Sequence, residues 1–217
     1  MVNYTLRMAI SDRFNLPEFM FSYFGRVDFG GDLFAQWPVG IRFDIGLERV
    51  PRAVNLYEFT FGNAEDCVLV SQDWLSDDPL AEFSTPAERF TPLFETPGVF
   101  SSASHYFQTA EISPFDESQY RLTWARLPPL AFDVNRMFQA IANRERGGAP
   151  SIASGVYIID PRSKIIMHMY DDRGLDVIAY EATTLLPLYK NFGEWVLDNQ
   201  RHRIACRFEN ALRETSP

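Results

Sequence analysis

A stretch in the C-terminal third of the chain, residues 155–198, constrains the fold more than any other part of the sequence. Its first run, 155–160 (GVYIID), is apolar and β-branched, and a short polar break separates it from a second run at 164–170. This spacing predicts a hairpin. In the second run, alternate residues fall on opposite faces and both sets are largely apolar, which predicts a central strand. A polar turn with a glycine follows at 171–174 (DDRG), and 175–180 (LDVIAY) is predicted to form a third strand.

A helix is predicted directly after the third strand. Apolar residues recur at helical spacing from Leu185 to Val196. Thr183 or Thr184 can cap the start of this helix, and Pro187 is expected in its first turn, where a missing N–H costs least. The stretch therefore predicts a three-stranded antiparallel meander with an amphipathic helix on one face.

The rest of the chain adds elements around this unit. Residues 40–46 (GIRFDIG) alternate, with Ile41, Phe43 and Ile45 facing inward, as in a half-buried strand. We expect this strand to lie beside the C-terminal strands because its amphipathic pattern matches theirs. Helices are also predicted at 12–24, 51–61, 134–146 and 204–213, and strands at 67–71 and 120–126.

Together these elements predict an α+β fold: a mainly antiparallel sheet of about five or six strands, built on the C-terminal three-stranded meander, with helices packed on at least one face. The length suits a single α+β domain over residues 1–217. Within it, residues 76–116 carry repeated prolines among phenylalanines. Because this composition is too aromatic for a disordered linker, we expect an ordered but irregular excursion with short elements, which can form part of a binding surface.

The net charge narrows the classes of partner. The chain has 20 Lys and Arg against 29 Asp and Glu, a formal net charge of −9. This balance argues against a nucleic-acid binder, which needs clustered Lys and Arg to neutralise phosphates, and suits a basic protein partner or solubility. No run reaches the roughly 18 apolar residues of a membrane span, so we expect a cytoplasmic protein that binds no membrane. Two cysteines, Cys67 and Cys206, match no disulfide framework or metal spacing, and we expect both to be reduced and buried.

Two segments taken together resemble a known family. They are LFAQWPVGIRFDIG at 33–46 and YDDRGLDVIA…LLPLYKNFGEWVLDNQRHRI, which ends at residue 204. The resemblance covers 33–46 and 153–204 and leaves the middle of the chain unmatched. The family is an uncharacterised bacterial domain family of small cytosolic proteins, whose members carry a similar YDDRG-DVIA…LYxxFxxWxLDxxR signature. Proteins of this kind are often found beside bacterial toxin genes, so the resemblance implies an immunity role, by association rather than by any site residue.

The polar turn at 171–176 is the densest cluster of charged residues in the C-terminal unit. It contains Asp171, Asp172, Arg173 and Asp176. Paired carboxylates can hold a cation or perform acid–base chemistry, and an arginine can bind a phosphate or a carboxylate. A turn between buried strands needs the same residue types, so an internal Arg–Asp pair that fixes the turn is the simpler interpretation.

Other polar residues have similar pairs of interpretations. His168 near this turn can act as a base, but a hydrogen-bonded core histidine is the simpler account. Arg42 and Asp44 on the 40–46 strand can line a pocket, although a cross-strand ion pair is the simpler account. Asp198 and Arg201 have the i,i+3 spacing of a helical ion pair.

The leading functional hypothesis is a non-catalytic binding protein, specifically a bacterial immunity protein that binds and neutralises a toxin. It follows from the acidic charge, the aromatic excursion and the incomplete set of catalytic residues. Acidic side chains would steer association with a basic toxin domain, and aromatic side chains would anchor it. The expected contacts are Asp77, Asp78, Glu82, Glu88 and Glu95.

The alternative is a small-ligand-binding or metal-binding enzyme. It would use His168, Asp171, Asp172, Arg173 and Asp176. The glycines match neither a dinucleotide fingerprint nor a P-loop, and the histidines have no metal-site spacing, so we expect no cofactor, no metal and no catalytic residue. A structural or regulatory domain with another partner is a third interpretation, and the sequence leaves the oligomeric state open.

Overall fold

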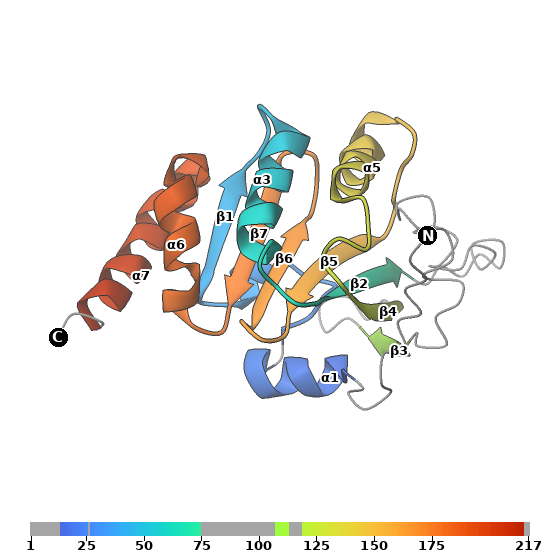
Figure 1. Cartoon of the computed structure of the whole chain (residues 1–217), viewed down its shortest axis with the longest axis horizontal. Coiled ribbons are helices and arrows are strands. Elements are labelled where there is room, and N and C mark those ends of the chain that lie inside the picture. The colour runs from blue at the N-terminus through green and yellow to red at the C-terminus, as the bar shows by residue number, and fades with distance from the viewer. Residues whose placement is uncertain (1–13, 26, 75–106, 113–118, 215–217) are drawn as a thin grey trace, which may run out of the picture.

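A single antiparallel sheet forms the centre of the molecule in the computed structural model, which describes residues 14–25, 27–74, 107–112 and 119–214 (Figure 1). Within these residues the strands are β1 (Gly40–Asp44), β2 (Cys67–Trp74), β3 (Phe107–Ile112), β4 (Gln119–Leu127), β5 (Gly155–Asp160), β6 (Ile165–Met169) and β7 (Gly174–Ala179). Their order across the sheet is β1-β7-β6-β5-β2-β4-β3, and every neighbouring pair is antiparallel. The fold is α+β as predicted, although the described sheet has seven strands rather than five or six.

The predicted C-terminal meander is confirmed. β5, β6 and β7 pair in sequence order, with Tyr157 opposite His168 and His168 opposite Asp176. β6 is a central strand, because Met167 packs into a hydrophobic cluster on one face of the sheet and Ile166 into a second cluster on the other.

The N-terminal strand β1 extends this meander, as expected. It pairs with β7, and Ile41, Phe43 and Ile45 are fully buried in the same face. The backbone of Val196 and Leu197 returns along the outer side of β1, where Leu197 N donates to the Arg42 carbonyl at 2.9 Å. Segments from the two ends of the chain are therefore hydrogen-bonded to one another.

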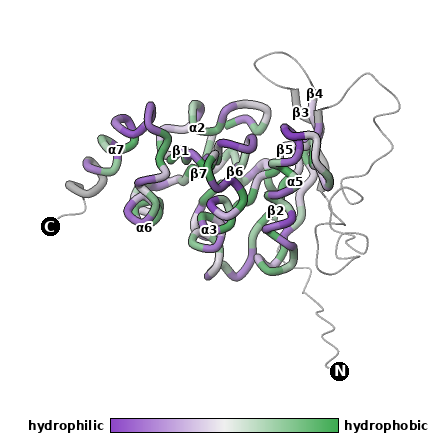
Figure 2. The backbone as a smooth tube through the Cα atoms, turned by 90° about the horizontal axis from the view of Figure 1, so that it is seen from above, coloured by the Kyte–Doolittle hydropathy of each residue, from purple (hydrophilic) through white to green (hydrophobic). Residues whose placement is uncertain are grey.

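Helices cover both faces of the sheet. One face packs against α3 (Arg49–Phe61), α5 (Val134–Arg146) and α6 (Ala182–Phe192), and α7 (Arg201–Glu214) lies against α6. The other face packs against α1 (Leu16–Phe19), the π-helical turn Met20–Phe24 and the residues around α2 (Leu33–Gln36). Figure 2 shows α3 and α6 on one side of the strands and α2 on the other. Among the described helices, none combines the length and apolar character that a membrane span requires.

Local signals set the ends of several helices. Asp133 caps α5 by accepting from Arg136 N at 2.9 Å, and Gly147 ends it with a φ of 69°, so the predicted helix over 134–146 is confirmed. The details predicted for α6 were wrong. It begins at Ala182 without a side-chain cap, contains Pro187 in its interior and ends at Phe192, because the chain then turns so that Val196 can bridge to β1.

Residues 107–112, which fall within the expected irregular excursion, form a short element of it, the strand β3, which pairs along β4. The other residues of 76–116 lie outside the described part of the chain. The predictions for the two cysteines had different outcomes. Cys67 is buried as expected, whereas Cys206 is exposed because α7 turns Ile204 and Phe208 toward the core instead.

Candidate functional site

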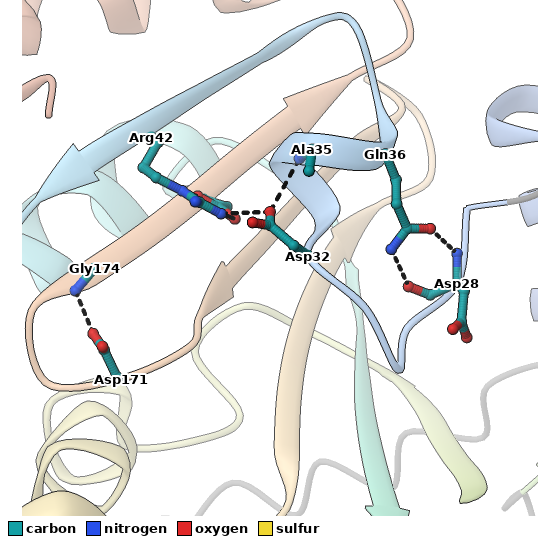
Figure 3. A network of polar contacts seen from close by, with 8 residues as sticks. Asp28, Asp32, Ala35, Gln36, Arg42, Asp171 and Gly174 are labelled. Atoms are coloured by element: carbon teal, nitrogen blue, oxygen red, sulfur yellow. Dashed lines mark hydrogen bonds and ion pairs between the residues drawn. The ribbon is translucent and has the colours of Figure 1, made fainter. Parts of the chain in front are cut away.

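The 171–174 turn is built from its own side chains. Asp171 Oδ1 accepts from the backbone N–H groups of Arg173 (2.8 Å) and Gly174 (2.7 Å), the second of which is drawn in Figure 3. Its Oδ2 lies 3.4 Å from Arg173 Nη2. The predicted internal Arg–Asp pair is confirmed, and Asp171 therefore acts as the cap of a tight turn.

Asp172 ties the same turn to the start of α3. Its Oδ2 lies 2.9 Å from Arg49 Nε, an ion pair that lacks hydrogen-bond geometry, and its Oδ1 lies 3.8 Å from Arg173 Nε. Both carboxylates approach Arg173, but Asp171 is held by the backbone of the turn and Asp172 by Arg49, so they do not form a paired-carboxylate site.

Asp176 belongs to a separate ion-pair network centred on Arg42. Figure 3 labels Arg42 and Asp32 of this network. Arg42 Nε and Nη2 donate to the two carboxylate oxygens of Asp176, each at 2.7 Å, and Nη2 also donates to Asp32 Oδ1 at 2.5 Å. Asp32 in turn caps α2 by accepting from Ala35 N. The cross-strand ion pair predicted for Arg42 is confirmed, while Asp44 accepts from Gly46 N in its own loop.

Burial explains why one arginine affects its two partners differently. The side chain of Asp176 is 1% exposed, and desolvation raises its pKa to about 6 even though the Arg42 hydrogen bonds oppose the rise. Asp32 is 47% exposed; desolvation is still the largest single influence on its pKa and raises it, but the Arg42 hydrogen bond, the backbone hydrogen bonds at the start of α2 and the charge of Arg42 together bring the pKa below the ordinary value. Burial alone would lower the pKa of Arg42, but the hydrogen bonds to Asp176 and Asp32 raise it above the ordinary value. All three groups are charged at neutral pH.

His168 lies in the same cross-strand row as this network. The row runs from Arg42 through Asp176 and His168 to Tyr157. His168 Nδ1 is 2.9 Å from the Val156 carbonyl, and its ring stacks on Tyr157 at a centroid distance of 4.0 Å. A carbonyl only accepts, so Nδ1 carries the proton and Nε2 holds the lone pair. Desolvation lowers the pKa of His168 to about 4, and the predicted hydrogen-bonded core histidine is confirmed in its neutral form.

A pocket of about 130 Å³ opens beside this row, where β5 begins. Its lining includes Gln72, Arg144, Gly155, His168 and Tyr170. Only His168 among these was a candidate in the sequence. The signal that could have found Gln72 is a polar residue at a position of β2 where Val68 and Val70 predict an apolar one. Arg144 and Gly155 carry no comparable signal.

The structure therefore brings few of the predicted site residues together. His168 and Asp176 are neighbours, but Asp171, Asp172 and Arg173 serve the turn and α3. In the part of the chain that the structure describes, no cluster of three or more His, Cys, Asp or Glu side chains is arranged to hold a metal ion. The proposed contacts Asp77, Asp78, Glu82, Glu88 and Glu95 lie outside the described residues.

Comparison with known proteins places the chain in a family without giving it an activity. It is 26% identical over 92 residues to the uncharacterized protein YnaE of Bacillus subtilis strain 168, a match that covers 40% of this chain and 43% of YnaE. No solved structure matches it. The model of a family described as a domain of unknown function, DUF3885, matches residues 16–200, which includes the middle of the chain, the first of the two segments that carried the resemblance and all but the last four residues of the second. The chain therefore belongs to the DUF3885 family.

Proposed function

We propose that this chain is a non-catalytic binding protein of the cytoplasm that recognises a basic protein partner and, more specifically, a bacterial immunity protein that neutralises a toxin. Support comes from the uneven distribution of its negative charge. Residues 75–106 contain five acidic side chains and one arginine, a net charge of −4 out of −9 for the whole chain. In the described part, by contrast, arginines lie against many of the carboxylates: Asp32, Asp66, Asp172 and Asp176.

Such a charge distribution favours fast association with a basic surface. A segment with an excess of acidic groups attracts a positively charged partner at long range and raises the association rate constant. The sheet, covered by helices on both faces, would serve as a rigid support for the connection between β2 and β3. The carboxylates of the 171–176 turn, in contrast, contribute mainly to the stability of the fold.

The proposal is tested by co-expressing the chain with the product of a toxin-like gene that neighbours its own gene. We expect cell survival and a stoichiometric complex whose association rate falls as salt increases. A variant with Asp77→Asn, Asp78→Asn, Glu82→Gln, Glu88→Gln and Glu95→Gln should associate about tenfold more slowly or worse, because its steering charge is lost.

A matched variant controls for net charge. Five exposed acidic residues of the described part are neutralised instead: Glu48→Gln, Glu58→Gln, Glu181→Gln, Glu194→Gln and Glu209→Gln. Association should then stay within about twofold, since the steering charge remains in place. Equal losses in the two variants would reject the specific contacts, and failure of the wild-type chain to bind or protect would reject the immunity role.

A second candidate function, a small-ligand or metal-dependent enzyme, is favoured by one observation: neutral His168 lines a pocket. This hypothesis assigns ligand contacts to the 171–176 turn, although its carboxylates are paired with other residues of the protein. Asp172→Asn and Arg173→Ala therefore test whether the turn contacts a ligand. If it holds, protein purified without added metal should contain a metal or ligand that Asp172→Asn loses. Unchanged content in both variants would remove the turn from the site.

A further inference from the structure

The pocket lies above a gap in the side-chain layer of the sheet. Gly155 is directly opposite Gln72 in the β2–β5 ladder and contributes no side chain to this layer. Tyr170, which follows β6, leans away toward Gly174, where a Cβ would lie only 1.8 Å from its hydroxyl oxygen. Space is thus left between Gln72 on one side and His168 and Tyr170 on the other.

Gln72 is the unusual group in this space. It is 3% exposed, and its Nε2 atom has no hydrogen-bond partner within the protein. A buried amide without a partner lowers stability, and native structures contain few of them. Gly155 also makes room for it, because a Cβ at that position would lie 2.7 Å from Gln72 Oε1 and 3.2 Å from the Tyr157 ring. Gln72, which lines the pocket, therefore carries a buried donor without a protein partner, at a cost in stability.

Two other side chains complete the chemistry of the pocket. His168 is neutral with its proton on Nδ1, so Nε2 is the acceptor it can offer. Arg144, in the last turn of α5, lines the pocket with a side chain that is 47% exposed, and its Nε lies 3.8 Å from Glu145, which is a weak surface contact. The pocket thus combines a buried donor, an acceptor and a cation near solvent.

We propose that this pocket binds a small carboxylate that also carries a primary amide or an equivalent planar donor–acceptor group, with the carboxylate at Arg144 and the amide between Gln72 and His168. The amide oxygen accepts from Gln72 Nε2, and the amide N–H donates to His168 Nε2. A fully deprotonated phosphate or sulfate fits less well because it has only acceptors and leaves His168 without a donor. This site is independent of the acidic segment and of any protein partner.

The test uses succinamate, a short molecule with both groups, and the full chain labelled with ¹⁵N. Signals of the Gln72 side-chain amide and the His168 ring are followed during the titration; the chain has three histidines, which keeps the ring spectrum simple. We expect saturable shifts of both signals. Succinamide, which lacks the charge, and butanoate, which lacks the amide, should each bind about tenfold more weakly or worse.

Two variants and their matched controls assign the binding to this pocket. Gln72→Leu and Arg144→Met should each weaken succinamate binding about tenfold or more. Arg146→Met removes the same charge from the same exposed turn of α5 but does not line the pocket, and Gln139→Leu removes an exposed amide from that helix. Both controls should bind within about twofold of wild type.

A stability measurement separates a binding role from a structural role for Gln72. Gln72→Leu should be at least as resistant to urea as the wild type, since it removes a buried unpartnered donor. A less stable Gln72→Leu protein would mean that the amide supports the fold, and would contradict the proposal. So would the absence of saturable shifts up to roughly 50 mM succinamate, or an equal loss of affinity in Arg144→Met and Arg146→Met.

Discussion

Arg42 joins more parts of the molecule than any other side chain described above. It hydrogen-bonds Asp176 and Asp32, and its guanidinium lies about 5 Å from the ring centroids of Phe34 and Tyr170. These contacts connect β1 to β7, to the α2 region and to the wall of the pocket. At the residue scale, Arg42 is therefore the group on which the polar layer depends most.

Replacing Arg42 should lower the stability of the fold strongly, because the buried Asp176 carboxylate cannot reach solvent. We expect Arg42→Met to lower the free energy of unfolding by about 3–5 kcal/mol, since it leaves a buried carboxylate without a partner. Arg173→Met removes an arginine that is 76% exposed and should cost at most about 1 kcal/mol. Urea denaturation measures both. The double variant Arg42→Met/Asp176→Leu should recover much of the loss, and a loss below about 1 kcal/mol for Arg42→Met would contradict this account.

His168 should make the stability depend on pH. Its pKa is about 4 in the folded protein, below the ordinary value of 6.5, so the unfolded chain takes up the proton first as the pH falls. Its contribution to stability is complete above pH 6.5 and is lost progressively between 6.5 and 4. The difference in unfolding free energy between wild type and His168→Gln should shrink by about 1–3 kcal/mol over this interval.

The comparison with His168→Gln isolates the histidine from the other titrating groups. Asp176, with its raised pKa, acts in the opposite direction over part of this range, but it is present in both proteins and cancels. His202→Gln serves as the control because His202 is exposed on α7. A pH profile that is the same in wild type and His168→Gln would show that His168 is not desolvated.

Residue types alone suggested some of these roles. The Arg–Asp turn, the bonded histidine and the Asp198–Arg201 pair, at 3.0 Å, were predicted from local spacing. Which acid pairs with Arg42 was not predictable, because Asp176 is 134 residues away and meets it only through the β1–β7 register. Arg144 carries no local signal, whereas Gln72 is marked only as a polar residue at a position where Val68 and Val70 predict an apolar one.

At the scale of elements, the end of β6 packs closely on the start of β7 because residue 174 is a glycine. The Tyr170 ring covers Gly174, and a Cβ at Gly174 would also lie 2.0 Å from Tyr170 Cζ. The strand can accept no side chain here unless the ring moves, and the ring also borders the pocket. The conformation of the β6–β7 turn and the shape of the pocket are therefore coupled.

Gly174→Ala should lower the unfolding free energy by about 1–3 kcal/mol and displace the Tyr170 ring, because the added methyl group overpacks the site. Gly193→Ala is the matched control: Gly193 has a φ of −58°, and no atom lies within 4 Å of an added Cβ. This variant should be neutral or stabilised by about 0.4–1 kcal/mol. Denaturation curves and Tyr170 ring chemical shifts report both effects. Equal stability of the two variants would show that the Tyr170–Gly174 contact is not tight.

At the scale of the whole molecule, the sheet interleaves distant parts of the chain. β1, from the first quarter of the sequence, pairs with β7, while β5 of the C-terminal meander pairs with β2. Neither half of the chain can therefore form the complete sheet without the strands of the other half. The prediction of one domain over residues 1–217 thus leads to an expectation for unfolding.

We expect a single cooperative unfolding transition. Tryptophan fluorescence, which includes Trp37 near β1, and far-UV circular dichroism should give coincident urea curves. Phe43→Ala, which empties a fully buried position on β1, should shift both curves equally and cost about 3–5 kcal/mol. Two separate transitions, or a shift in fluorescence alone, would indicate two domains instead.

The sequence by itself determined the elements whose signals are local. The β5–β7 meander follows from strand periodicity and a DDRG turn, the inward face of β1 from alternation, and α5 from Asp133 and Gly147 at its ends. Each of these elements depends on residues that are only a few positions apart, so the local sequence is enough to predict it.

Only the tertiary structure decided the places of β2, β4 and β3 in the sheet, the partner of Asp176 and the pocket that Gln72, Gly155 and His168 line together. These features depend on register between strands far apart in sequence. A one-residue shift in any ladder would turn a different set of side chains to each face, and local spacing does not encode that choice. The register is fixed instead by burying two hydrophobic clusters at once, which is a property of the whole sheet.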